Sequence, residues 1–548
     1  MKKINVLLLL LFAISTITRA NDVQLANVSI ENTGPGQIMV KFDVSWQNSW
    51  RINVGPANYD GVWVFFKYKT ASGNWSHINL TGNNNSTPAG FEIYQNSGTN
   101  KAGAMIYRDA SNLGTGNVSI SGVRLGVVNS LPYDIDVRGF AVEVVYIPKP
   151  LTRSFFGDGN GTTESIRAFH AADNTATTNS VVPVSVDINA NDDAELDTDG
   201  MYLYSNDTIQ KTNPIGSLDP FPTMKALWCM KYELTQAGYR DFLNSLTQTQ
   251  QAIRTTAAPT SIAGTNVMPP PTTIYSNYIQ IKTPAAGAEP AVYGCNANGN
   301  AVLDEATDGE WIACNWLTWP DLAAYLDWSG LAPMSELQFE RMARGTSSAG
   351  SQPAIYGEFA WGNTNIFSTF YTPANRYAAN ETLSNASSTL GNAIYGSTYF
   401  SLPEFGPVRS GIFATPTSNR TTSGAGYYGV MELSGNIAEY CITIGTEAGR
   451  SARYIPNGDG DIATTGNARL NIGAGGYWPG MEGNTNSAVA NSCIGGCEVS
   501  GNAGIMIRGG YWYSPVGQLS IGDRSQNGQP SIVSRLGYGG GRGVLHIR

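Results

Sequence analysis

The sequence predicts an α+β protein in which an all-β, sandwich-like domain precedes a longer domain of short helices and irregular loops. From about Val23 to Pro148, apolar and polar residues alternate with the two-residue period of strands, and no helical stripe of useful length appears. Farther along, short amphipathic segments with capping residues lie among stretches rich in Gly, Asn, Ser and Thr. A chain of 548 residues is also too long for one ordinary core, so we expect two or more domains.

Residues 1–20 are predicted to be a secretory signal peptide. Two lysines precede an apolar run from Val6 to Ile14, and Thr-Arg-Ala at positions 18–20 provides a small-residue cleavage site. The run is shorter than the ~20 residues that span a bilayer, so no transmembrane segment is expected after cleavage. We therefore expect an exported protein that is periplasmic, at the cell surface or extracellular. Its formal charge of −9 makes nucleic acid an unfavourable partner, because phosphate binding requires a basic face.

The all-β domain is predicted to cover residues 21–140. Its strand candidates are Ile38–Trp46, Val62–Tyr68, Ala104–Arg108, Val118–Val128 and Asp134–Ile147. Polar turn clusters such as Thr-Gly-Asn-Asn-Asn at positions 81–85 separate them, which favours a sandwich of antiparallel strands. The aromatic and Asn content also permits carbohydrate binding, but aromatic residues in strands belong to the core more often.

The second domain is predicted to cover residues 141–548 and to open with a strand from Val144 to Pro148. Three helices are expected inside it. Thr235 caps the first, Pro320 lies in the first turn of the second, and Ser335 begins a capping box, Ser-Glu-Leu-Gln, at the third. The side chains expected on the buried faces of the first two helices are Tyr239, Phe242, Leu243, Leu322, Tyr325 and Leu326.

Six cysteines in an exported chain permit disulfides without requiring them. Two pairs are plausible from their local setting: Cys493 with Cys497 around a flexible Ile-Gly-Gly loop, and Cys295 with Cys314 around a polar insert. Cys229 and Cys441 adjoin apolar segments, where buried free thiols are expected. Zinc is disfavoured, because no CxxC pair exists and only three histidines are present.

Five segments of the second domain follow one another in an order that resembles the formylglycine-generating-enzyme, or sulfatase-modifying-factor, family. They are YELTQAGYRDFLN from Tyr232, CNWLTWPDLAAYLDWSGLAPMSELQFERMARG from Cys314, WGN from Trp361, GYYGVMELSGNIAEYC from Gly426 and IRGGYWYS from Ile507. The resemblance implies a variant of the C-type-lectin fold, which contains little regular structure.

The resemblance also locates the family's catalytic positions. Oxidases of this family bind Cu(I) through two cysteines that lie just after the RGGxW segment, and those positions are Ser514 and Leu519 here. Neither side chain is a soft ligand, so we expect no copper. Iron is not expected either, because His77, His170 and His546 are far apart in the sequence. The prediction is a non-catalytic binding or structural protein; the alternative is an oxidoreductase of the family with an altered active site.

The family's calcium site is the cofactor site that the resemblance carries over. The matching ligands are the side chains of Glu432 and Glu439 and the carbonyl oxygens of Gly435 and Ile437. Such mixed carboxylate and carbonyl oxygens suit a hard cation. A second family site would use Asn380 and the carbonyl of Glu381. The alternative is a purely structural turn in which Asn436 and Glu439 cap backbone amides.

A ligand-binding face is expected around the family's active-site cleft. The residues placed there are Tyr511, Trp512, Tyr513, Arg524 and Tyr538. Rigid aromatic side chains give contact area with little loss of entropy, which favours recognition of a protein or a glycan at the cell surface. The alternative is that these side chains pack in the core, above all Trp512.

Overall fold

The computed structural model shows a strand-rich mixed fold, with 34% of residues in strands and 11% in helices, in agreement with the predicted α+β class. It describes residues 23–547 with gaps at 35–36, 72, 97–100, 129–130, 133, 151–152, 159–167, 172–183, 189–193, 197–200, 203–224, 270–276, 346–353, 397–405, 453–454, 471–477, 482–496 and 527–533. The predicted signal peptide therefore lies outside the described residues. None of the described helices combines the length and hydropathy that crossing a bilayer requires.

The sandwich predicted near the N-terminus is present. A three-stranded sheet in the order β1 (Gln24–Gly34), β2 (Gln37–Arg51), β7 (Gly114–Gly126) forms one layer. Side chains of β2 such as Phe42 meet side chains of the facing layer such as Phe66, whose ring lies 5.2 Å away. The two sheets thus enclose an apolar core, as sandwich packing requires.

The facing layer is an eight-stranded sheet that joins the two predicted domains. Its order is β17-β25-β14-β8-β3-β6-β5, and β4 pairs with β3. The bounds are β3 Asp60–Thr70, β4 Ser76–His77, β5 Phe91–Tyr94, β6 Ala104–Arg108, β8 Ile135–Ile147, β14 Leu227–Met230, β17 Ala332–Pro333 and β25 Gly543–His546. The predicted boundary at residue 140 falls inside β8, and the sheet continues through β14 and β25 of the second region.

Alternation along β3 explains how one sheet serves two cores. Val62, Val64 and Phe66 point into the sandwich, whereas Trp63 and Phe65 belong to the second core under the helices. Because nearly every one of these positions is apolar and buried, the strand has a hydrophobic run on both faces. The sequence VWVFFKY is therefore a dense apolar run and does not alternate regularly between apolar and polar residues.

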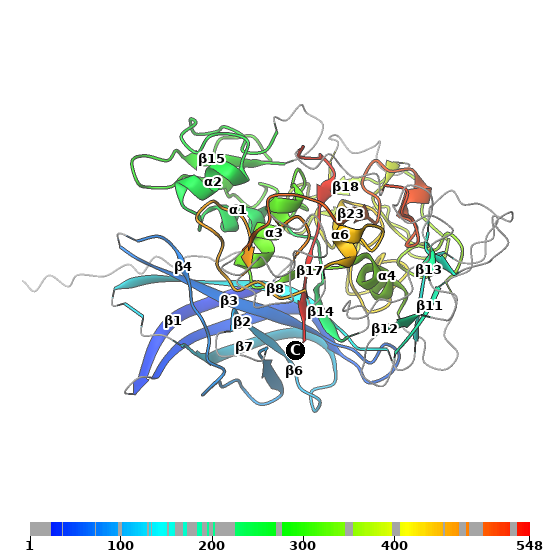
Figure 1. Ribbon diagram of the computed structural model, residues 1–548, viewed down its shortest axis with the longest axis horizontal. Coiled ribbons are helices and arrows are strands. Elements are labelled where there is room, and N and C mark those ends of the chain that lie inside the picture. The colour runs from blue at the N-terminus through cyan, green and yellow to red at the C-terminus, as the bar shows by residue number, and fades with distance from the viewer. Residues whose placement is uncertain are drawn as a thin grey trace, which may run out of the picture.

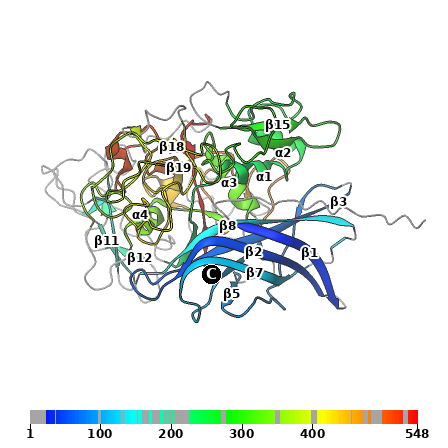
Figure 2. The same ribbon diagram turned by 180° about the vertical axis from the view of Figure 1, so that it is seen from behind.

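Short helices cover the second face of the large sheet (Figures 1 and 2). Their bounds are α1 Gln236–Leu243, α2 Gln248–Arg254, α3 Trp319–Trp328, α4 Glu336–Arg344 and α6 Glu447–Arg450. The predicted helix starts are confirmed: the side chains of Thr235 and Ser335 accept hydrogen bonds from first-turn amides, and Pro320 lies in the first turn of α3, whose cap, Thr318, the sequence analysis did not name. The six side chains predicted to face the core are all buried.

The remaining elements are short and separated by loops. The small sheets contain β9 Arg153–Phe156, β10 His170–Ala171, β11 Val184–Ile188, β12 Ala194–Leu196, β13 Met201–Tyr202, β15 Ile279–Thr283, β16 Val292–Cys295, β18 Pro373–Ala374, β19 Thr382–Leu383, β20 Ala438–Ile442, β21 Arg469–Leu470, β22 Cys497–Glu498, β23 Ile505–Arg508 and β24 Gly539–Gly540. A single turn of 3-10 helix spans Val516–Leu519. One sheet, in the order β23-β20-β24, carries the candidate site.

Candidate functional site

The turn that leads into β20 has a backbone that only particular residues adopt comfortably. Glu432, Gly435 and Asn436 have positive φ angles of 54°, 95° and 66°. At Gly435 a side chain would also collide, because its Cβ would lie 2.5 Å from the carbonyl oxygen of Ile394. The glycine is therefore required both by conformation and by close approach of the backbone.

Glu432 and Glu439, the two predicted calcium ligands with carboxylates, are both buried. Glu439 is fully engaged: its two oxygens accept hydrogen bonds of 2.7 and 2.6 Å from Nε and Nη2 of Arg542. Glu432 accepts one bond of 2.7 Å from the amide of Gly411 through Oε1, whereas its Oε2 has no partner. Protein donors therefore bond both oxygens of Glu439 but only one oxygen of Glu432 among the described residues.

Glu233, which lies shortly after β14, also belongs to the site, although the sequence analysis did not predict it. Its carboxylate accepts hydrogen bonds from Nδ2 of Asn436 at 2.5 Å and from the amide of Ile437 at 3.1 Å. The YELT segment that contains it was the available signal, but nothing in the sequence tied its glutamate to the turn. Burial raises the pKa of Glu233 well above its usual range, and the nearby Glu432 and Glu439 add to this effect. Burial also raises the pKa of Glu432 to about 7.

The arrangement does not fit a calcium ion, which takes six to eight oxygen ligands. Both oxygens of Glu439 are bonded to the guanidinium of Arg542, whose positive charge would repel a cation beside them. At the second predicted site, the Glu381 carbonyl accepts a hydrogen bond from Arg409 Nε at 2.9 Å, and the Asn380 carbonyl faces Asn375. Across the described ranges, no group of three or more His, Cys, Asp or Glu is placed to hold a metal.

The aromatic face is fastened directly to this turn. The amide of Trp512 donates to the carbonyl of Asn436 at 2.9 Å, and the amide of Ala438 donates to the carbonyl of Tyr538 at 2.9 Å. Tyr511 and Tyr538 stack with ring centroids 4.1 Å apart and planes within 12°. Tyr513 is 50% exposed. The turn therefore sets the position of the tyrosines.

Two of the residues assigned to this face are core residues instead. Trp512 is buried, as the alternative interpretation held. The prediction for Arg524 was wrong: it is fully buried, its Nε donates to Glu336 at 2.8 Å, and its guanidinium lies 4.4 Å from the ring of Phe169. A buried guanidinium needs a carboxylate, and Glu336 of α4 supplies it. Tyr511, Tyr513 and Tyr538 remain as candidates for the face, and of these Tyr511 and Tyr538 are half-buried against the core.

The positions of the family's catalytic cysteines are buried. Ser514 is inaccessible and its Oγ accepts a hydrogen bond of 3.1 Å from the amide of Tyr511. Leu519 packs in the core at the end of the 3-10 helix. Both side chains support the backbone under the tyrosines, and neither is a thiol.

The disulfide predictions have different outcomes. Cys295 and Cys314 are both free and buried, so the predicted pair is wrong. Their side chains serve the core, where Cys295 ends β16 and Cys314 lies beside Asn277. Cys229 and Cys441 are free and buried as predicted. Cys497 is disulfide-bonded, and Cys493 lies outside the described residues.

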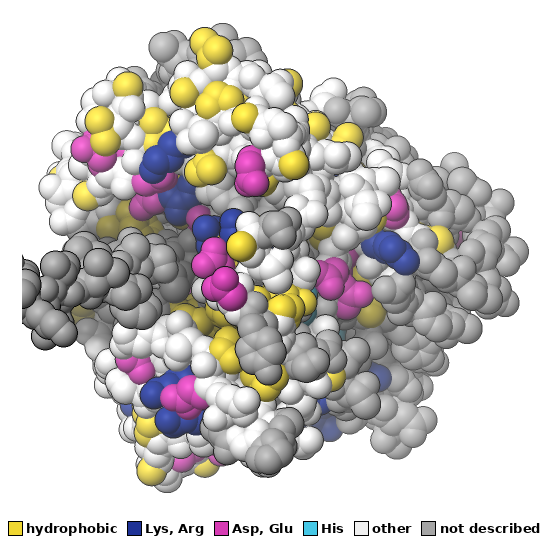
Figure 3. Space-filling model, turned by 90° about the vertical axis from the view of Figure 1, so that its left-hand side faces the viewer, with side chains coloured by type: hydrophobic (Ala, Val, Ile, Leu, Met, Phe, Trp, Pro, Cys, Tyr) yellow, Lys and Arg dark blue, Asp and Glu magenta, His cyan; other side chains and the backbone are white. Residues whose placement is uncertain are grey.

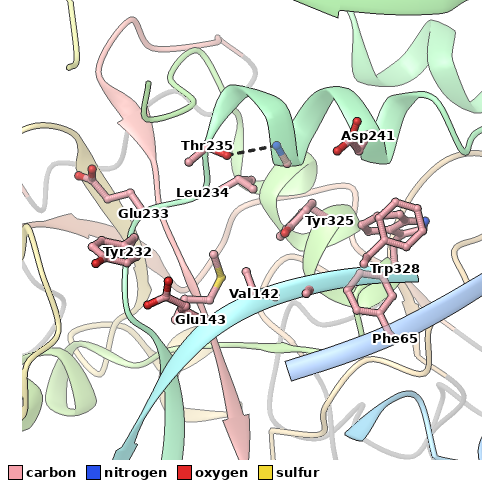
Figure 4. Close-up of a pocket in the computed structure, with 14 residues that line it drawn as sticks. Phe65, Val142, Glu143, Tyr232, Glu233, Leu234, Thr235, Asp241, Tyr325 and Trp328 are labelled. Atoms are coloured by element: carbon pink, nitrogen blue, oxygen red, sulfur yellow. Dashed lines mark hydrogen bonds between the residues drawn. The ribbon is translucent and has the colours of Figure 1, made fainter. Parts of the chain in front are cut away.

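A small cavity lies between the large sheet and the helices (Figure 4). In that view Tyr232 and Glu233 lie at one end, and Phe65 and Trp328 at the other. Its volume is about 30 Å³, which accommodates about two water molecules at ~10–15 Å³ each. Glu143 lines it and pairs with Lys231 at 2.8 Å. The cavity is too small for an organic substrate.

Comparison of the chain with protein-family models gave no match. Comparison with curated proteins gave none either. The resemblance to sulfatase-modifying factors therefore rests on the five segments alone.

Proposed function

We propose that this is an exported, non-catalytic binding protein that presents Tyr511, Tyr513 and Tyr538 to a protein or glycan at the cell surface. The scaffold of residues 141–548 would be a C-type-lectin-like, sulfatase-modifying-factor fold. The observation that carries the proposal is the stacked tyrosine pair held by backbone hydrogen bonds to the turn at 435–438. A face that is rigid before binding loses little entropy when a partner is bound.

The chemistry at Ser514 and Leu519 supports binding over oxidation. Activation of oxygen on Cu(I) in this family requires two thiolates, and a hydroxyl and an alkyl group cannot supply them. The copper-loaded protein should therefore leave a sulfatase-type cysteine peptide unoxidised in air, while an enzyme with both cysteines converts it. Conversion that stops when Cu(I) is chelated would restore the oxidoreductase alternative.

The binding test compares the mature protein with Tyr513→Ala and Tyr538→Ala variants on glycan arrays and on envelope proteins in a pull-down. Leu113→Ala is the control, because Leu113 is 48% exposed and lies in the sandwich, far from the tyrosines in sequence. Loss of roughly tenfold or more in affinity for one partner in both tyrosine variants is expected, as for an aromatic hot spot. Equal binding by all variants would exclude this face.

A further inference from the structure

Arg542 donates four hydrogen bonds within one buried junction. Nε and Nη2 form a two-bond fork with the carboxylate of Glu439, at 2.7 and 2.6 Å. Nη1 faces the carbonyl oxygens of Met230 and Lys231, at 3.3 and 3.1 Å. Arg542 and Glu439 are both fully buried, so this is a charge-assisted pair without solvent screening.

The junction gathers three parts of the chain that are distant in sequence. Glu439 lies in β20 just after the turn, Met230 ends β14, and Arg542 immediately precedes β25. The parallel pairing of Glu439 with Gly540 brings the first and the third of these parts side by side. Removing the guanidinium would therefore loosen both the turn and the contact between β14 and β25 in the large sheet.

Arg542 is the cation of a junction that holds three buried carboxyl groups. Glu233, Glu432 and Glu439 are all buried within one cluster and influence one another. Arg542 supplies a positive charge through N–H donors, where a metal ion would supply it by accepting oxygen lone pairs. The two arrangements compete at Glu439, because the guanidinium bonds both of its oxygens and its positive charge would repel a metal ion placed beside them.

A second buried arginine–glutamate pair serves as a comparison for the Arg542–Glu439 junction. Arg524 and Glu336 are also fully buried and 2.8 Å apart. Oε1 of Glu336 additionally accepts bonds of 2.8 Å from Thr443 Oγ1 and the Ile444 amide, and Nη1 of Arg508 lies 3.8 Å from its Oε2, so a second guanidinium remains beside this carboxylate without Arg524. At the Glu439 junction, by contrast, Oε2 of Glu432 has no hydrogen-bond partner among the described residues, and Glu432 lines a cavity of about 10 Å³, the size of one water.

We propose that the guanidinium of Arg542 takes the place of a calcium ion at this junction, so that the turn and the tyrosine face are fastened without metal. The folded protein then neither binds calcium at the turn nor depends on it. This inference does not rest on the proposed binding function, because it concerns how the turn is held and not what the tyrosines recognise.

The experiment measures the melting temperature of the mature protein in EDTA and in millimolar calcium. The unmutated protein should melt at the same temperature in both. Arg542→Ala should melt roughly 5 °C lower or more in EDTA, because an uncompensated buried carboxylate cluster remains. Added calcium should recover a large part of that loss, since the vacated space is bordered by carboxylate oxygens.

Arg524→Ala is the matched control. It also breaks a fully buried arginine–glutamate pair and should lower the melting temperature, but calcium should not restore it, because Glu336 keeps its donors at Oε1 and the Arg508 guanidinium near Oε2. If Arg542→Ala does not fold, Arg542→Lys retains one positive charge and should show a smaller loss with a smaller calcium response. A calcium-induced rise in the melting temperature of the unmutated protein would overturn the proposal. So would an Arg542→Ala or Arg542→Lys protein that does not respond to calcium.

Discussion

Lys67 carries its ammonium group into the interface between the large sheet and the helices. Nζ donates to the carbonyl oxygen of Trp328 at 2.8 Å and to that of Gly460, and it lies 5.1 Å from the ring of Trp328. Burial lowers the pKa of Lys67 to about 7, although Asp461 and Asp327 oppose the effect. An amine that is easily deprotonated thus sits where the sandwich meets α3.

The pH dependence of stability should reveal this lysine. An unfolded lysine binds its proton below about pH 10.4, whereas Lys67 in the folded protein binds it only below about pH 7. Between these values the unfolded chain binds more protons, so the free energy of unfolding should fall as pH is lowered from 10 to 7. Lys67→Met should flatten that slope in denaturant titrations. An unchanged slope would show that Lys67 is not the responsible group.

Four buried thiols give a second prediction at the residue scale. Burial raises the pKa of Cys229 to about 12, and it raises the pKa of Cys295, Cys314 and Cys441 as well. A thiol reagent should therefore find no reactive cysteine in the native protein and four in the denatured, unreduced protein. Two fewer would mean that Cys295 and Cys314 are bonded after all.

Helix starts are the elements that the sequence predicted best, because a cap is a local interaction. Thr235 and Ser335 each bond an amide three residues ahead, and nothing distant has to be known to foresee it. Most strands of the N-terminal region were also foreseen: Ala104–Arg108 matches β6 residue for residue, and the other predicted strands shift by up to five positions at their ends, but β1 and β5 were not predicted.

The capping box of α4 allows a direct test. Ser335 is fully buried, and its amide and hydroxyl exchange hydrogen bonds with Gln338 at 2.9 and 3.1 Å. Ser335→Ala should lower the free energy of unfolding by about 1–2 kcal/mol. Thr247→Ala removes the equivalent box of α2, which is partly exposed, and should have a smaller effect. Equal losses in urea titrations would show that burial does not strengthen the cap.

Pairs between distant elements could not be predicted in the same way. The bond between Glu233 and Asn436 and the fork between Arg542 and Glu439 join residues 203 and 103 positions apart, and a single sequence has no local pattern for such contacts. The same limit explains Arg524, which looks like a surface cation until Glu336 is brought beside it. Residue type was sufficient for caps and strand periodicity, but not for buried charge partners.

At the scale of the whole molecule, the shared sheet joins what the sequence divides. β8 pairs with β3 on one side and with β14 on the other, and a single core extends from Trp63 to Leu545. Figure 3 shows one side of the molecule. Hydrophobic, basic and acidic side chains lie there along the hollow between the sandwich and the second region. The two regions should therefore unfold together.

Calorimetry of the mature protein should show one transition, with the calorimetric enthalpy equal to the van't Hoff enthalpy. A fragment of residues 23–147 should expose the second face of the large sheet, including Trp63 and Phe65, and should aggregate or bind a hydrophobic dye. A soluble, cooperatively folding fragment would instead establish the sandwich as an independent domain.

The position of β25 in the sheet also governs when the molecule can become complete. Val544 pairs with Cys229, and β25 lies between β14 and β17, so β14 has an open edge until β25 arrives. Roughly 300 residues separate these partners, and at about 5–20 residues per second a ribosome needs about 15–60 s to deliver the missing strand. Throughout that interval the nascent chain displays an unpaired strand edge beside a half-covered apolar face, which is a template for association with other chains. The edge of β14 therefore requires protection during synthesis, and a chaperone that binds the chain before β25 emerges would provide it.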